Sequence, residues 1–78
     1  MRKKELKLVI SFATTTDALE MEKICKDNGA GGRMIPVPRV ISAGCGLAWA
    51  AEVSEKEELV RLMEKYHLQA EGIHECMI

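Results

Sequence analysis

The sequence predicts an α+β fold in which two helices pack on one face of a four-stranded antiparallel sheet. Apolar residues recur at every second position in the segments 6–12 and 47–53, which is the period of a half-buried strand. Helix-capping residues at 14–17 and 54–57 each precede a run in which apolar residues recur at helical spacing. A length of 78 residues suits one small domain, and we expect residues 1–78 to form a single one.

The first strand begins at Leu6, and the first helix follows it directly. The segment 14–17, Thr-Thr-Thr-Asp, supplies capping hydroxyls and a carboxylate, and Asp17 and Glu20 have the spacing of a capping pair. Asn28 and Gly29 end the helix, because glycine readily adopts the left-handed conformation of a helix C-cap. The apolar positions are Leu6, Leu8, Ile10 and Phe12 on one face of the strand, opposite Lys7, Val9 and Ser11, and Ala18, Met21, Ile24 and Cys25 on one face of the helix.

A short second strand is expected at 33–37. Pro36 cannot donate a backbone hydrogen bond, so this strand must lie at an edge of the sheet. The alternative is that the Gly31-Gly32 region stays disordered and the second strand never pairs, which would leave a three-stranded sheet. The third strand, 47–53, has Leu47, Trp49, Ala51 and Val53 on one face and Ala48, Ala50 and Glu52 on the other.

The second helix opens at Ser54-Glu55-Lys56-Glu57, which has the spacing of a capping box. Its buried stripe comprises Leu59, Leu62, Met63 and Tyr66. The last strand covers Ala70 to Met77, with Gly72 as a candidate bulge. The resulting order, strand, helix, strand, strand, helix, strand, is the ferredoxin-like βαββαβ arrangement, with strands one and three central and strand two at an edge.

Charge and composition narrow the functional classes. The chain has 11 basic and 12 acidic residues, and the slight basic excess of residues 1–53 is too mild to imply nucleic-acid binding. No apolar run reaches the length of a signal peptide or a membrane span, so we expect a cytoplasmic protein that does not bind membranes. Three cysteines without a C-x-x-C motif suit a reducing compartment and predict neither a disulfide framework nor a metal or cofactor site.

Cys45 is the residue best suited to chemistry. Gly44 and Gly46 remove side chains from both sides of its sulfur, and Pro36 and Pro38 stiffen the preceding segment. An exposed thiol of this kind is typical of reactive cysteines. The alternative is that the glycines mark an ordinary turn and the thiol is buried, as free cysteines often are.

The expected topology gives Cys45 a specific environment. Because strand three runs antiparallel to strand one, Cys45 should lie beside Thr15 and Thr16 at the start of the first helix. The helix dipole there lowers the pKa of a thiol and would also stabilise a persulfide anion. Arg39, in the same loop, either adds positive charge or is a solvated cation.

The other two cysteines are expected to lie elsewhere. Cys25 belongs to the apolar face of the first helix, about 15 Å from Thr15 at helical rise. Cys76 lies at the far end of the last strand, roughly 20 Å from Gln69 at strand rise, and should not easily reach Cys45. A lone thiol suits a carrier that holds sulfur and passes it on, whereas a dithiol oxidoreductase needs a second cysteine nearby.

Three segments carry a more specific pattern: Phe-Ala-Thr-Thr-Thr-Asp-Ala at 12–18, Arg-Met-Ile-Pro-Val-Pro-Arg at 33–39 and Ile-Ser-Ala-Gly-Cys-Gly-Leu at 41–47. Together they resemble the DUF3343 family of small bacterial domains, which are described as selenium/sulfur carrier-like proteins. The most restrictive part is the I-P-V-P-R string followed by a short spacer and C-G. The resemblance covers nearly the whole chain and implies that Cys45 is the carrier thiol, with Gly46 beside it.

The resemblance implies a component of a relay. A donor such as a cysteine desulfurase or a selenium-handling enzyme would charge Cys45, and an acceptor enzyme would take the sulfur or selenium. No histidine or carboxylate is placed as a base for Cys45, so we expect a carrier rather than a stand-alone catalyst. The rival hypothesis is a ferredoxin-like ligand-binding or protein-interaction module, with an open sheet face carrying Val9, Ala48 and Ala50 that could pair two copies as a homodimer.

Overall fold

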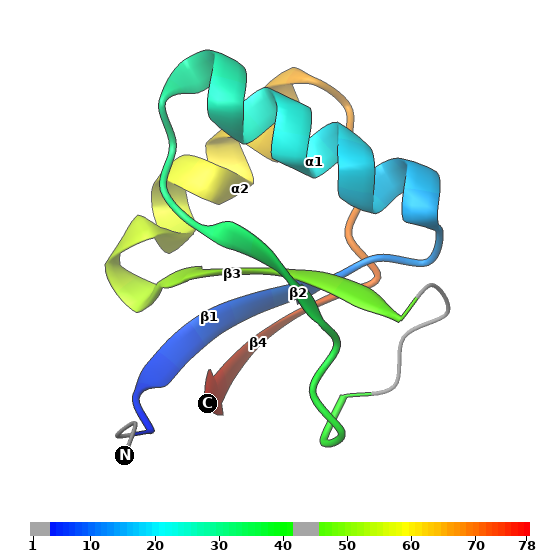
Figure 1. Ribbon diagram of the computed structural model, residues 1–78. Helices are drawn as coiled ribbons and strands as arrows, with labels where there is room; N and C mark the ends of the chain where they lie inside the picture. Colours follow the sequence, from blue (N-terminus) through cyan, green and yellow to red (C-terminus); the bar gives the residue numbers. More distant parts are fainter. Residues whose placement is uncertain (1–3, 42–45) are drawn as a thin grey trace.

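The computed structural model describes residues 4–41 and 46–78 and has the βαββαβ order that the sequence predicts (Figure 1). The sheet order is β2-β3-β1-β4, and each neighbouring pair is antiparallel. Both helices lie on one face of the sheet. The elements are β1 (Leu6–Ser11), α1 (Thr15–Asn28), β2 (Arg33–Pro36), β3 (Leu47–Glu52), a short 3₁₀ helix η1 (Val53–Glu55), α2 (Lys56–Lys65) and β4 (Gly72–Met77).

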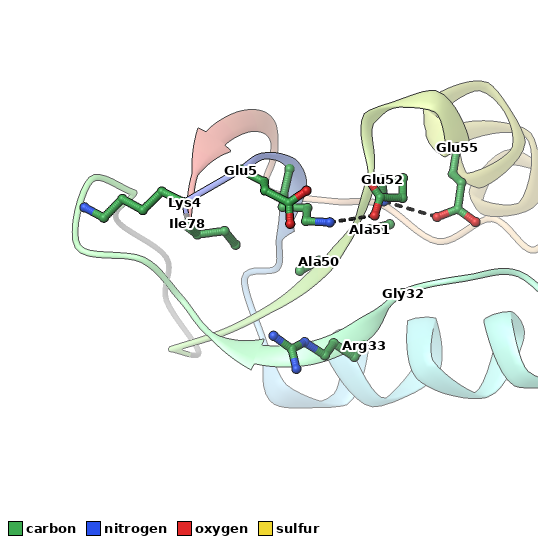
Figure 2. A pocket seen from close by; sticks show the side chains of 10 residues that line it. Lys4, Glu5, Gly32, Arg33, Ala50, Ala51, Glu52, Glu55 and Ile78 are labelled. Carbon is green, nitrogen blue, oxygen red and sulfur yellow. Dashed lines mark hydrogen bonds and ion pairs between the residues drawn. The ribbon is translucent and has the colours of Figure 1, made fainter. Parts of the chain in front are cut away.

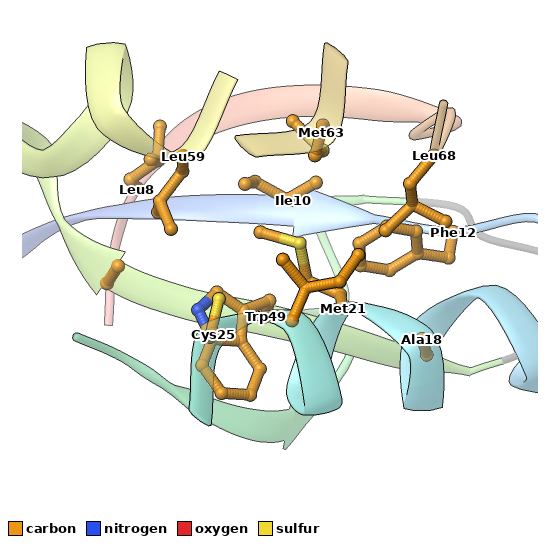
Figure 3. Close-up of a cluster of buried hydrophobic side chains, with 12 residues drawn as sticks. Leu8, Ile10, Phe12, Ala18, Met21, Cys25, Trp49, Leu59, Met63 and Leu68 are labelled. Atoms are coloured by element: carbon orange, nitrogen blue, oxygen red, sulfur yellow. The ribbon is translucent and has the colours of Figure 1, made fainter. Parts of the chain in front are cut away.

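The main core lies between the sheet and the two helices (Figure 3). The predicted apolar faces of β1 and α1 are confirmed, with the exception of Leu6, which is 47% exposed at the start of β1. On α2, Leu59 and Met63 are buried, but Tyr66 is exposed instead of completing the stripe. Its hydroxyl accepts a hydrogen bond from the Asn28 side-chain amide at 3.2 Å, which holds the ring at the surface between the helix ends. Buried members of this core are Leu8, Ile10, Phe12, Ala18, Met21, Ile24, Cys25, Trp49, Ala51, Leu59, Met63 and Leu68.

Local hydrogen bonds set where each helix begins. The cap of α1 is Thr14, whose Oγ1 accepts from the Asp17 N–H at 3.2 Å, so the expected Asp17–Glu20 pair is not the cap. Gly29, with φ of 68°, ends α1 as predicted. The capping box that precedes α2 joins Glu52 to Glu55, not Ser54 to Glu57, because β3 runs directly into η1 and the chain turns earlier.

The two glycines before β2 are ordered and closely packed. The Trp49 indole N–H donates to the Gly31 carbonyl at 3.2 Å. Gly32 has φ of 115°, and a Cβ there would lie 2.7 Å from the Ala50 carbonyl oxygen. The chain can therefore cross the Trp49 indole only with glycine at this position. The strand that follows pairs with β3 along its whole length at the sheet edge, so the three-stranded alternative is wrong.

The last strand pairs with β1 in an uninterrupted register from Met77 opposite Leu6 to Gly72 opposite Ser11. The Glu71 N–H continues this pairing by donating to the Ser11 carbonyl at 2.7 Å. Gly72 is therefore a regular ladder position, and the predicted bulge is wrong. Among the described residues, neither α1 nor α2 has the length and apolar character needed to cross a membrane.

The sheet face opposite the helices carries a second, smaller core. Val9 and Ala48 are fully buried there, together with Ile41 and Cys76, and Ile35 and Val37 pack against them. Ile41 and Val37 belong to the connection between β2 and β3, which folds back below the sheet (Figure 1). The expectation of an open face is therefore wrong at Val9 and Ala48, which the connection covers. Ala50 is buried as well, but it borders the half of the face that the connection leaves uncovered.

Candidate functional site

The candidate thiol, Cys45, and the neighbouring Gly44 lie outside the described residues, so the site is built from the chain on either side of them. We use "Cys45 loop" for residues 37–46, which join β2 to β3. The Val37 N–H donates to the Gly46 carbonyl at 2.9 Å, one step beyond the Pro36–Leu47 pair that ends the β2–β3 ladder. Gly46 is exposed and has φ of 74°. Both ends of the loop are thus fixed to the sheet.

A turn near the middle of the loop separates an anchored residue from two exposed ones. The Ile41 N–H donates to the Pro38 carbonyl at 2.9 Å, which closes a turn with Arg39 and Val40 at its centre. The Ile41 side chain is only 7% exposed and packs in the second core, whereas Val40 is 83% exposed and Arg39 is also exposed. The loop therefore holds Arg39 and Val40 away from the sheet.

The start of α1 lies at the same end of the sheet as the end of the Cys45 loop. Ser11, the last residue of β1, pairs with Ala48 near the start of β3, so the β1–α1 connection leaves the sheet where β3 enters it (Figure 1). Thr15 and Thr16 are exposed in the first turn of α1, where backbone N–H groups have no partner within the helix. Within the described part of the chain, no hydrogen bond or ion pair joins Arg39 to either threonine.

The two described thiols differ from the candidate in environment. Cys25 is buried in the main core, as predicted, and burial, followed by the charges of Glu55 and Glu58, raises the pKa of its thiol to about 11. Cys76 is opposite Lys7 and is buried in the second core with Ile41 of the Cys45 loop, a neighbourhood that the sequence reasoning missed. The sequence does hold a signal for this packing. Ile35, Val37 and Ile41 are apolar, and two of them lie beyond the end of the edge strand, which indicates that the connection after the strand packs against an apolar surface.

The described residues contain no group of three or more His, Cys, Asp or Glu side chains suited to holding a metal ion. They do contain a hollow of about 720 Å³ on the half of the open face that the Cys45 loop leaves uncovered (Figure 2). Sequence reasoning missed this hollow because its walls come from segments far apart in the chain. The lining residues are Lys4, Glu5, Lys7, Gly32, Arg33, Ala50, Ala51, Glu52, Glu55 and Ile78.

Charges of both signs face the hollow. Lys7 Nζ lies 2.5 Å from Glu52 Oε1, and this hydrogen bond is the main cause of a raised pKa of Lys7. The charges of Glu5 and Arg33 act on the same ammonium in opposite directions, so both lie within electrostatic range of it. Across residues 4–41 and 46–78, neither Glu5 nor Arg33 forms an ion pair of its own. Among the described residues that line the hollow, Arg33 and Lys4 thus have no anionic partner, and Glu5 and Glu55 have no cationic one.

The family follows from a comparison of the whole sequence with known protein families. The model of the family described as "Putative Se/S carrier protein-like" matches residues 7–75. The chain belongs to this family. The matched part of this Se/S carrier-like chain includes all four strands, both helices and the Cys45 loop, except for the ends of β1 and β4. No curated protein and no solved structure shows a significant match to the chain.

Proposed function

We propose that this protein carries sulfur or selenium as a persulfide or selenosulfide on Cys45 and passes it from a donor enzyme to an acceptor enzyme. The observation that carries the proposal is the family match, which spans the Cys45 loop and nearly all of the fold around it. Of the three thiols in the sequence, Cys25 and Cys76 are buried in the two cores. Burial and a pKa of about 11 keep Cys25 protonated near neutral pH, so it is a poor nucleophile.

The described surroundings of the loop support this role. Gly46 is exposed next to Cys45, and a Cβ there would meet nothing within 4 Å, so the position leaves space for a partner to approach. The first turn of α1, with Thr15 and Thr16, lies at the same end of the sheet. A helix N-terminus favours anions, including a thiolate or a persulfide anion. Arg39 adds a positive charge in the same loop.

The transfer step requires no external oxidant or reductant. The Cys45 thiolate attacks the outer sulfur of a persulfide on the donor, a new S–S bond forms at Cys45, and the bond between the two donor sulfurs breaks. The electron pair of that bond leaves with the donor as a thiolate, so the donor cysteine is regenerated. Transfer to the acceptor repeats the exchange, with the Cys45 thiolate as the leaving group. A selenium cargo follows the same steps with selenium as the outer atom.

Intact-mass spectrometry tests this proposal directly. The full chain is incubated with a cysteine desulfurase and cysteine, beside the variants Cys45→Ala and Cys25→Ala/Cys76→Ala. We expect a gain of one sulfur in the wild type and in the double variant, and no gain in Cys45→Ala. A gain that persists in Cys45→Ala, or a native Cys45 that resists alkylation and gains no sulfur, would contradict the carrier role.

The hollow on the open face favours a second candidate function, the binding of a small zwitterion such as an amino acid. Its volume is within the range of small-molecule sites, and Arg33 and Glu5 offer an unpaired cation and an unpaired anion within the described part of the chain. A carboxylate would pair with the guanidinium, and an ammonium with the carboxylate.

Calorimetric titration with free cysteine and with serine tests the second function. We expect heat of binding in the wild type that Arg33→Gln weakens at least fivefold, while Lys23→Gln, which removes an exposed cation from α1, leaves it unchanged. An equal loss in both variants, or no heat in the wild type, would show that Arg33 is not part of a specific site.

A further inference from the structure

The centre of the Cys45 loop presents an unusual pair of side chains, Arg39 and Val40, which we call the loop tip. Val40 has the largest exposed fraction, 83%, among the large apolar side chains of the described residues, and the other exposed ones reach only 37–57%. Burial of this side chain against a partner would release hydrophobic free energy that the isolated protein does not gain. From the loop tip we infer that Arg39 and Val40 dock the protein on its sulfur-donor enzyme, an inference that rests on the proposed carrier function.

The loop tip is held in a defined conformation. The turn hydrogen bond from the Ile41 N–H to the Pro38 carbonyl, at 2.9 Å, fixes the two tip residues between a proline and a buried anchor. Pro38 itself has restricted backbone freedom. Ile41 is packed against the sheet in the second core, so the tip cannot fold inward to bury Val40. A preorganised loop loses little conformational entropy when it binds, which favours its use in recognition.

The two side chains define the chemistry of the surface that they would contact. Val40 requires an apolar pocket, and Arg39, which has no ion pair within the described part of the chain, requires carboxylates at its rim. Arginine is enriched among the residues that dominate binding energy at interfaces. The matching surface on the donor enzyme is therefore an apolar pocket with an acidic rim, near the cysteine that holds its persulfide.

The position of the tip along the chain connects docking to transfer. Cys45 follows Val40 by five positions in the sequence, a span of at most about 18 Å when fully extended. Because the loop is tied to the sheet at Val37, Gly46 and Ile41, an enzyme that holds the tip also limits where the loop thiol can be. Docking at the tip would raise the effective concentration of the thiol at the donor persulfide.

Kinetics with two sulfur sources test this inference. Sulfur loading of Cys45 is followed by intact mass, once with a cysteine desulfurase and cysteine and once with inorganic polysulfide, which needs no docking surface. We expect Val40→Asp to raise the KM for the carrier at the desulfurase at least tenfold and to leave the polysulfide rate unchanged. Arg39→Glu should raise the same KM, and its polysulfide rate is not used as a control because Arg39 also adds charge near the thiol. The matched control is Leu19→Asp, which places the same charge at a half-exposed apolar position on α1 and should change neither rate.

The outcomes separate the docking inference from the carrier function. If the wild type is loaded from both sources and the tip variants keep the wild-type KM at the desulfurase, docking is overturned and the carrier role remains intact. Slower loading of Val40→Asp from polysulfide as well would place the effect on the thiol and also overturn docking. If the tip variants convert a wild-type dimer to a monomer in gel filtration, the tip binds a second copy instead. No loading of the wild type from either source would overturn both proposals.

Discussion

At the scale of single residues, the fold sets the reactivity of Cys25. Its thiol is 1% exposed, and burial together with the nearby carboxylates of Glu55 and Glu58 raises its pKa from 9.0 to about 11. The folded state thus favours the protonated thiol, whereas the unfolded chain loses the proton at lower pH. The stability that this difference contributes is fully present below pH 9 and is lost as the pH rises towards 11.

We therefore predict that the free energy of unfolding of the wild type falls between pH 9 and pH 11 by about 1–2 kcal/mol more than that of Cys25→Ala. Urea denaturation of both proteins at pH 8, 9, 10 and 11 measures this difference, and the comparison cancels effects that the two proteins share. If the free energies of unfolding of the two proteins change with pH by the same amount, burial does not hold the Cys25 proton. Iodoacetamide should modify Cys25 rapidly only in urea.

At the scale of elements, the Gly31-Gly32 segment determines whether β2 can join the sheet. A side chain at Gly32 would collide with the Ala50 carbonyl and the Trp49 indole, and φ of 115° is strained for any other residue. We predict that Gly32→Ala lowers the free energy of unfolding by about 2–4 kcal/mol. Thermal and urea denaturation measure the loss.

Gly29→Ala is the matched control for Gly32→Ala. Gly29 also has positive φ, 68°, but a Cβ there would meet nothing within 4 Å, so only the backbone strain of about 1 kcal/mol remains. Equal losses in the two variants would show that the contacts of Gly32 with β3 carry no energy, and that the glycine serves its backbone conformation alone.

The elements illustrate what local pattern can and cannot predict. The alternation from Leu6 and the glycine after Asn28 are local signals, and both predicted elements are confirmed. The capping box lies at Glu52 and not at the predicted Ser54 because a 3₁₀ turn precedes α2, as is frequent at the ends of α-helices. The Gly31-Gly32 segment is ordered by its contacts with Trp49, which is distant in sequence. No local signal in the sequence could therefore reveal that the segment is ordered.

At the scale of the whole molecule, the sheet has a core on each face, and only one of them could be predicted. The main core follows from amphipathic helices and strands, whereas the second forms because the Cys45 loop folds back onto β1, β3 and β4. Contacts of this kind join residues far apart in the chain, and so do the walls of the hollow near Arg33. The prediction of Cys45 as the reactive thiol came from local sequence alone and stays a prediction, because Cys45 lies outside the described residues.

Ile41 is the residue by which the second core holds the Cys45 loop. It is 7% exposed and packs with Val9, Ala48 and Cys76. We predict that Ile41→Ala lowers the free energy of unfolding by about 2–3 kcal/mol, since it removes buried methyl groups and leaves a cavity. Hydrogen exchange should also accelerate at the Val37 N–H, whose bond to the Gly46 carbonyl closes the base of the loop.

The control for Ile41→Ala is Val40→Ala, one residue away and 83% exposed, which should change neither stability nor exchange. If the two variants prove equally stable, the second core contributes nothing and the loop is held by its backbone hydrogen bonds alone. If Ile41→Ala loses stability while exchange at Val37 stays slow, the base of the loop is independent of the core. The expected result, a loss of both, would mean that the packing of one side chain below the sheet determines how firmly the thiol-bearing loop is held.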